Sequence, residues 1–376
     1  MNKQITKNQH YVPQCLLKHF ANGKKKSKKK INIFDTYRSE LRYNQPIKNA
    51  FSENYFYDKD NQTEDFLANQ IETPASRIID KIINGNFDLV NKEKLILQHF
   101  ILSLFYRTPE ASERASLFVN SHLESVVRQL LSLNGFDPEM ASAGSFNFHP
   151  DHLASLLAFQ GVIDAVLLED LKYHIIKNET QLEFYISDHP VFIYNWLYRD
   201  LEHPEVTSIA ATGLQVFLPL SPKITLCLYD PKVYKYGQSS RLVTCIDNNN
   251  DIEILNSFQI INSDSFIGFY SKQSETCLKR LYERYKNVRL HQYESDILST
   301  NKEAKGKIKS THSSFTKQAK LRKKPSFIKI KKKFKGCALS YQERDPDLAC
   351  IHREYMKQIH EQKQHSIIEL DRNKRK

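Results

Sequence analysis

The sequence has few of the motifs by which many enzyme classes are identified. It contains only 10 Gly in 376 residues and no GxxxxGKS, GxxxxGKT or GxGxxG sequence, so a glycine-rich loop that cradles phosphate is unsupported. It also has no HExxH zinc motif, and no serine stands in a GxSxG turn. The sequence alone therefore does not disclose a reaction.

Cysteine pairs and long apolar runs are missing as well. The six cysteines are scattered without a CxxC pair, which argues against a zinc site and a disulfide framework and fits a reducing cytosol. The longest apolar stretch near the middle, Val191–Tyr198, is too short to span a bilayer. The first residues contain no apolar segment of the kind found in secretory signals. We therefore expect a cytoplasmic protein without a transmembrane segment, and no feature indicates its oligomeric state.

The net charge of +12 is concentrated at one end of the chain. After residue 300 there are 22 Lys and Arg against 8 Asp and Glu, whereas residues 1–300 hold 33 against 35. This predicts one nearly neutral globular domain over residues 1–300 and a basic tail over 301–376 that is disordered or partly helical. Lysines of the tail and of the run after Gly23 are predicted to bind nucleic acid, namely Lys24, Lys25, Lys26, Lys323, Lys324, Lys331, Lys332 and Lys333. The alternatives are a solvated loop at the first run and a membrane-surface contact through Phe327 and Ile328 in the tail.

The order of the apolar patterns predicts an α+β fold. Residues 31–57 alternate apolar and polar side chains around turn residues, as short strands do. Residues 63–171 show helical spacing, and residues 173–270 hold mainly short β-type runs bounded by Asp, Pro, Ser or Gly. Because the helices precede the strands, we expect a short N-terminal β element and a helical core, followed by an antiparallel sheet and the basic C-terminal tail.

The densest stretch of the chain is QHYVPQCLLKHFA, residues 9–21. Pro13 favours an extended conformation before it and the start of a helix after it. Leu16, Leu17 and Phe20 then share one helical face, which we expect to be buried. His10 precedes the helix, where it either hydrogen-bonds the fold together or meets an anionic ligand at the helix N-terminus.

Further motifs follow in a fixed order. They are SENYFY at residues 52–57, TEDFLANQIE at 63–72, FYRTPE at 105–110, FYISDHPVF at 184–192 and VFLPLSPKITLCLYD at 216–230. Together with the opening stretch, this series resembles the bacterial family known as domain of unknown function 4238, over roughly residues 5–290. The resemblance implies a cytosolic prokaryotic protein and an association of some members with defence against bacteriophage. It implies no catalytic mechanism.

The polar residues of these motifs form the candidate site. The predicted catalytic residues are His10, Tyr11, Glu53, Glu72, Arg107 and Asp188, and the predicted ligands of a Mg²⁺ or Mn²⁺ ion are His10, Glu53, Glu64 and Asp188. Such an ion activates water for phosphodiester hydrolysis, whereas His10 or Tyr11 could act as a general acid without a metal.

Each of these residues also has a structural interpretation. Arg107 ends a very apolar helix, and a buried arginine needs a carboxylate such as Glu72 or Glu53. Asp188 can close a turn ahead of Pro190. Two functions follow from the two interpretations. One is a hydrolase of nucleic acid or nucleotides that acts in phage defence, and the other is a non-catalytic nucleic-acid-binding or sensing module.

Overall fold

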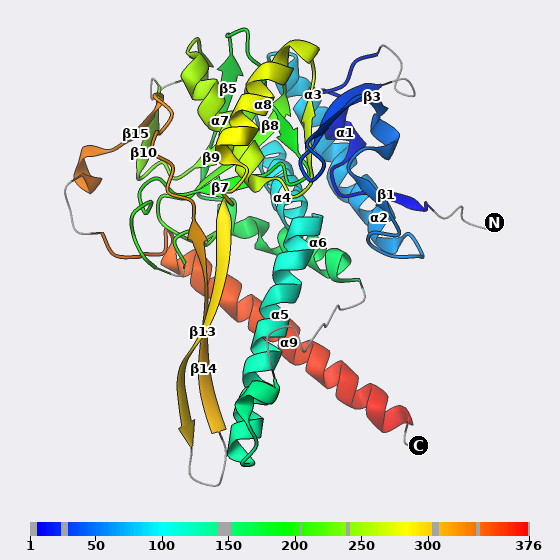
Figure 1. Cartoon of the computed structure of the whole chain (residues 1–376), viewed down its shortest axis with the longest axis vertical. Helices are drawn as coiled ribbons and strands as arrows, with labels where there is room; N and C mark the ends of the chain where they lie inside the picture. Colours follow the sequence, from blue (N-terminus) through cyan, green and yellow to red (C-terminus); the bar gives the residue numbers. More distant parts are fainter. Residues whose placement is uncertain are drawn as a thin grey trace.

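The computed structural model of the chain describes residues 6–23, 29–141, 152–203, 205–237, 241–302, 308–335 and 339–374. Over these residues helices combine with mixed and antiparallel sheets, which confirms the predicted α+β class. Figure 1 shows the sheets and most helices gathered in one body, from which one long helix, one long hairpin and the C-terminal helix extend.

The opening of the chain folds as Pro13 predicts. Pro13 is extended, with φ −67° and ψ 143°, and directly precedes the short helix α1 (Gln14–Leu17). Upstream of it, β1 (Asn8–His10) pairs antiparallel with β4 (Ser52–Asn54). The apolar face of the opening stretch is fully buried, as predicted, through Leu16, Leu17 and Phe20.

A helical layer follows the opening, also as predicted. A π-helical turn, Leu67–Glu72, joins its first two helices. Turns of this kind are rare in proteins, and many of those that occur lie at functional sites. The helices are α2 (Gln62–Phe66), α3 (Thr73–Ile83), α4 (Asn91–Tyr106), α5 (Pro109–Leu133) and α6 (Leu153–Asp164).

The larger sheet has five strands in the order β11-β5-β9-β8-β7. Neighbouring strands are antiparallel except for β11 and β5, which run parallel. The sheet is therefore mixed, whereas the prediction was an antiparallel sheet. A helix, α7, separates β11 from the next strand along the chain. The strands are β5 (Lys172–Asn178), β7 (Phe192–Tyr194), β8 (Gln215–Ser221), β9 (Ile224–Tyr229) and β11 (Val243–Ile246).

The smaller sheet corrects the prediction of a separate N-terminal β element. Its order is β3-β2-β12-β6, so β2, from the start of the chain, pairs with β12, which in turn pairs with β6. Side chains of α7 hydrogen-bond to the backbone of residues 185–191, which ties this sheet to the larger one. The elements are β2 (Lys30–Asp35), β3 (Glu40–Pro46), β6 (Ile186–Ser187), β12 (Phe266–Phe269), α7 (Asn249–Asn262) and α8 (Glu275–Tyr285).

The region predicted as a tail is largely built into the fold. Strands β13 (His291–Lys302) and β14 (Ile308–Gln318) form a hairpin that crosses residue 300 and extends beside α5 (Figure 1). Further on, β15 (Ile328–Ile330) pairs with β10 (Tyr234–Tyr236), and α9 (Pro346–Lys374) ends the chain. Leu321, Phe327 and Ile328 are buried, because the lysine-rich segment supplies apolar side chains to the core beside β10. The independence of residues 1–300 as a domain stays a prediction.

Among the described residues, no helix combines the length and the apolar character needed to cross a bilayer.

Candidate functional site

Arg107, at the C-terminal end of α4, is the most deeply buried charged residue of the predicted site. Its side chain has no exposed surface, and its Nη2 lies 2.9 Å from Oε1 of Glu72. A buried guanidinium requires an opposite charge. The structure therefore confirms the predicted ion pair and selects Glu72 rather than Glu53 as the carboxylate.

The guanidinium of Arg107 is only partly satisfied by this contact. Its Nε and Nη1 have no hydrogen-bond partner among the described residues. Burial by itself lowers the pKa of Arg107, but the nearby Tyr57, Glu72 and Glu64 outweigh burial and raise it. The side chain is therefore a fixed positive charge with unused donors, which an anionic group could accept.

Glu64 lies close to this pair, and its pKa is shifted by it. Burial, followed by the charge of Glu72, raises the pKa of Glu64 to about 7, although Arg107 acts in the opposite direction. Glu64 belongs to α2, and Glu72 is the last residue of the π-helical turn that follows it. A carboxyl group with a pKa near neutrality has the property expected of a general acid or base.

His10 and Tyr11 are enclosed by the fold. The Nε2 of His10 lies 3.2 Å from the carbonyl oxygen of Ile47, and burial lowers the pKa of the imidazole. A neutral His10 therefore donates its Nε2–H to this carbonyl. Burial, followed by the charges of Asp188 and Glu53, raises the pKa of Tyr11, so its hydroxyl stays protonated. Both residues fit the structural interpretation of the opening stretch.

Asp188 organises a loop far away in the sequence. Its carboxylate accepts the backbone N–H groups of Asp264, Ser265 and Phe266 at 2.9, 2.6 and 2.7 Å. The predicted turn ahead of Pro190 is therefore replaced by a long-range contact. Burial raises the pKa of Asp188 to about 7, while these hydrogen bonds act to lower it.

The predicted metal ligands are not assembled into one group. Across the described ranges, no three His, Cys, Asp or Glu side chains are placed so that they could hold a metal ion. Of the predicted ligands, His10 is engaged by Ile47 and Asp188 by the loop 264–266, while Glu53 lies exposed on β4. The metal site thus stays a prediction.

Sequence reasoning missed a second polar cluster next to the first. Thr108 caps α5, and its Oγ1 lies 2.5 Å from Nδ1 of His189. The Nε2 of His189 in turn lies 3.5 Å from Oε2 of Glu110. All three residues belong to the motifs FYRTPE and SDHP, so the signal was present in the sequence, but it did not show that the two motifs touch.

The motifs that supply these contacts lie in a part of the sequence that matches a known protein family. The sequence model of the family described as "Protein of unknown function (DUF4238)" matches residues 8–273. The chain belongs to this family. Comparisons with curated proteins and with solved structures give no significant match. The residues matched by DUF4238 include both polar clusters, the one around Arg107 and the one around His189. The match ends before β13.

A strongly basic part of the chain lies outside the residues matched by DUF4238. It is formed by residues 320–335, here called the basic segment, which contain nine Lys or Arg and no Asp or Glu. A groove of about 740 Å³ lies along this segment. Six lysines and no carboxylate are among the described residues that line it, namely Lys235, Lys324, Lys329, Lys331, Lys332 and Lys335.

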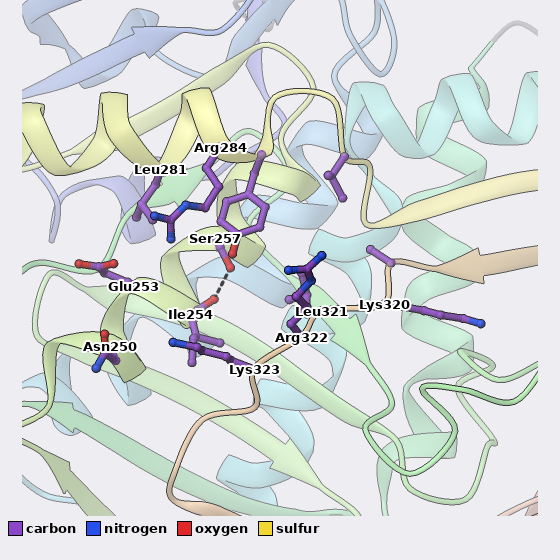
Figure 2. Close-up of a pocket in the computed structure, with 13 residues that line it drawn as sticks. Asn250, Glu253, Ile254, Ser257, Leu281, Arg284, Lys320, Leu321, Arg322 and Lys323 are labelled. Atoms are coloured by element: carbon purple, nitrogen blue, oxygen red, sulfur yellow. Dashed lines mark hydrogen bonds between the residues drawn. The ribbon is translucent and has the colours of Figure 1, made fainter.

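A second cavity, of about 570 Å³, lies between α7, α8 and the start of the basic segment. Figure 2 shows Arg284, from α8, and Arg322 and Lys323, from the basic segment, around this cavity. The carboxylate on its wall, Glu253, is held by Arg280 at 2.7 Å. This cavity is therefore also basic.

Some of the lysines predicted to bind nucleic acid line these two cavities. Lys323 lines the cavity below α8, and Lys324, Lys331 and Lys332 line the groove. Lys333 lies over the ring of Phe334 at 4.9 Å. The other predicted contacts, Lys24, Lys25 and Lys26, lie outside the described residues.

Proposed function

We propose that this protein binds nucleic acid through the basic segment. The observation that supports the proposal is the groove lined by six lysines and no carboxylate among the described residues. Lysines that neutralise phosphates release the counterions condensed on nucleic acid, and this release drives binding. The second basic cavity, beside Arg284, extends the positive surface toward α8.

The basic segment is held in place by the fold, which favours binding. Three of its own residues, Leu321, Phe327 and Ile328, bury their side chains in the core. Asp251 of α7 accepts hydrogen bonds from the backbone N–H and the hydroxyl of Ser326, at 2.8 and 2.5 Å. Because the backbone carrying the lysines is already ordered, less conformational entropy is lost on binding than for a disordered basic tail.

The experiment is fluorescence anisotropy with single-stranded RNA and DNA of about 20 nucleotides at several salt concentrations. We expect binding that weakens steeply as salt rises. In the triple variant Lys329→Gln, Lys331→Gln and Lys332→Gln, the slope of log K against log salt should become shallower by about 2, since each phosphate contact contributes about 0.7.

A matched control separates local contacts from overall charge. The triple variant Lys48→Gln, Lys59→Gln and Lys92→Gln removes the same charge from exposed positions elsewhere. It should leave the slope nearly unchanged. Equal losses in the two triple variants, or salt-independent binding by both, would reject the proposal.

Deleting residues 301–376 is a poor test, because the deleted part stabilises the fold. The side chain of Arg344 is 2 % exposed, and its Nε donates to Asp170 at 2.7 Å. It also donates to the carbonyls of Ile209 and Ala211. Loss of these contacts exposes buried surface, so lost binding in a truncated chain would not identify the lysines as its cause.

A second candidate function is a hydrolase of phosphodiester bonds that acts in phage defence, with Mg²⁺ or Mn²⁺ as the cofactor. The observation that favours it is Glu64, whose pKa is raised to about 7, beside Arg107 donors that have no partner in the part of the chain that the structure describes. Incubating the protein with RNA, DNA and nucleotides and either ion tests the reaction. Products that depend on Glu64 support it, whereas no product from any substrate, or equal products from Glu64→Gln, rejects it. A plaque assay in cells that express the protein tests the defence role.

A further inference from the structure

The cavity of about 570 Å³ below α8 has a volume in the range of sites for small molecules. Three stretches of the chain supply its described lining, namely residues 250–257 of α7, residues 281–288 at the end of α8 and just after it, and residues 319–323. None of these residues lines the lysine groove of about 740 Å³. The two cavities are therefore separate sites.

Four exposed cationic side chains line this cavity, and they come from two sides. Arg284 belongs to the last turn of α8, whereas Lys320, Arg322 and Lys323 belong to the basic segment. Figure 2 shows Arg284, Arg322 and Lys323 around the same space. Because the four side chains are exposed, a ligand in the cavity can reach their charges. Like charges that are brought together repel one another, and a bound anion relieves this repulsion.

These cations are largely free to bind a ligand. Arg284, Arg322 and Lys323 make no hydrogen bond or ion pair with any residue that the structure describes. The Nζ of Lys320 lies 3.8 Å from Glu202, but both side chains are well exposed, and surface pairs of this kind are weak. The carboxylate of Glu253, on the cavity wall, is already held by Arg280 of α8.

The cavity also has an aromatic and apolar wall. Tyr285, Ile254, Val288 and Ala319 are half-buried and line it. The side chain of Tyr285 packs against the hydrophobic clusters on either side of α7 and α8 and is still partly exposed. Its ring has no aromatic partner within the described ranges. A flat group of a ligand can therefore stack on it, directly beside the charge of Arg284.

The walls are held in position before any ligand binds. The backbone N–H of Ala319 donates to the carbonyl oxygen of Leu290 at 2.8 Å, and the backbone N–H of Leu321 donates to the hydroxyl of Tyr194 at 3.3 Å. Within α7, the buried hydroxyl of Ser257 donates to the carbonyl oxygen of Ile254 at 2.7 Å. Since the lining is already ordered, binding costs less conformational entropy.

We propose that this cavity binds a nucleoside polyphosphate. The phosphates lie against Arg284, Arg322 and Lys323, and the base stacks on Tyr285. The planar guanidinium of arginine matches the geometry of phosphate oxygens, and several cations on two sides suit more than one phosphate group. The inference goes beyond nucleic-acid binding, since it concerns a different cavity and a small ligand.

The test is isothermal titration of the full chain with adenosine diphosphate, adenosine and pyrophosphate, at equal ionic strength and without divalent cations. Adenosine diphosphate is a suitable probe, because every base presents a face for stacking. We expect it to bind saturably and at least about tenfold more tightly than adenosine or pyrophosphate, because neither of these contacts both the cations and the ring.

Two substitutions test the two halves of the ligand. Arg284→Gln should weaken binding of adenosine diphosphate about tenfold, whereas Arg77→Gln, at an exposed position of α3, should leave it unchanged. Tyr285→Leu should weaken binding of adenosine diphosphate about fivefold and leave binding of pyrophosphate unchanged. Tyr285→Phe keeps the ring and should bind like the wild type. Thermal unfolding establishes that each variant is folded.

Each other outcome counts against the proposal. Equal affinity for pyrophosphate and adenosine diphosphate removes the base from the site, and equal affinity for adenosine removes the phosphates. Absence of nucleotide binding, together with weaker binding of RNA by Arg284→Gln, assigns the cavity to the nucleic-acid surface. The triple variant of Lys329, Lys331 and Lys332 should bind adenosine diphosphate normally, because these lysines do not line this cavity. Failure of this inference and failure of nucleic-acid binding are therefore distinguishable.

Discussion

The Nη2 of Arg107 lies 2.9 Å from Oε1 of Glu72, and this contact joins the end of α4 to the π-helical turn before α3. The arginine has no exposed surface, whereas the glutamate side chain is 20 % exposed. A fully buried guanidinium with a single close carboxylate depends strongly on that carboxylate for its stability. The pair therefore ties the end of α4 to the turn from which α3 begins.

Removing one partner of this pair should be much more damaging than removing both. Glu72→Met leaves the guanidinium of Arg107 buried without its carboxylate, and we expect a loss of roughly 3 kcal/mol in the free energy of unfolding. The double variant Arg107→Met, Glu72→Met buries no charge at this place and should regain most of that loss. Urea unfolding of the wild type, both single variants and the double variant measures the coupling. Additive losses in the double variant would show that the two side chains do not depend on each other.

Glu64 should make stability depend on pH in a known direction. Its pKa is raised to about 7 in the folded protein from 4.5, so its contribution is fully present below pH 4.5 and is lost as pH rises through about 7. Glu64→Gln should therefore gain stability relative to the wild type over this interval. After allowance for its remaining contact with solvent, the gain should be roughly 2 kcal/mol.

The measurement for Glu64 is the difference in unfolding free energy between the variant and the wild type at about pH 4.5 and about pH 8. Taking the difference removes the contributions of other groups, such as His189, whose lowered pKa acts at acidic pH. Glu169→Gln is the control, because Glu169 is exposed on the surface. A difference for Glu64→Gln that is equal at the two pH values would contradict the raised pKa.

Local chemistry made some of this structure predictable. Pro13 fixes its own backbone, so the helix start and the buried face that follows it could be derived from neighbouring residues alone. The burial of Arg107 could be predicted in the same way, since an arginine within an apolar helical pattern has no exposed face to occupy. Its need for a carboxylate follows from the cost of burying a charge.

The contacts between residues far apart in the sequence could not be predicted. Strands β2 and β12 are more than 200 residues apart, and neither carries a pattern that names its partner. For the same reason the structural interpretation of Asp188 is limited to a turn in its own motif, whereas its carboxylate accepts hydrogen bonds from the loop 264–266. The contact between Thr108 and His189 likewise joins two motifs that are separated by 81 positions. High lysine content suggested a disordered tail, but the few apolar residues within it anchor the segment.

Asp188 should act on stability because its carboxylate holds the loop 264–266. Asp188→Ala leaves three backbone N–H groups without their acceptor, and we expect a loss of roughly 3 kcal/mol in the free energy of unfolding. Urea unfolding measures this loss, with Asp200→Ala at an exposed position as the control. An unchanged stability would overturn the structural role and return Asp188 to the candidate catalytic residues.

Asp251 offers a test of whether the basic segment acts through its fixed position or through its charge alone. Its carboxylate accepts two hydrogen bonds from Ser326, so Asp251→Asn should loosen the segment while making the protein more positive. Charge alone predicts tighter binding of single-stranded RNA, whereas loss of order predicts weaker binding, and we expect a fall of roughly three- to tenfold. Asp247→Asn changes the charge equally at an exposed position before α7 and should not weaken binding. Anisotropy titrations at one salt concentration compare the two variants with the wild type, and tighter binding by both would show that the arrangement of the lysines is unimportant.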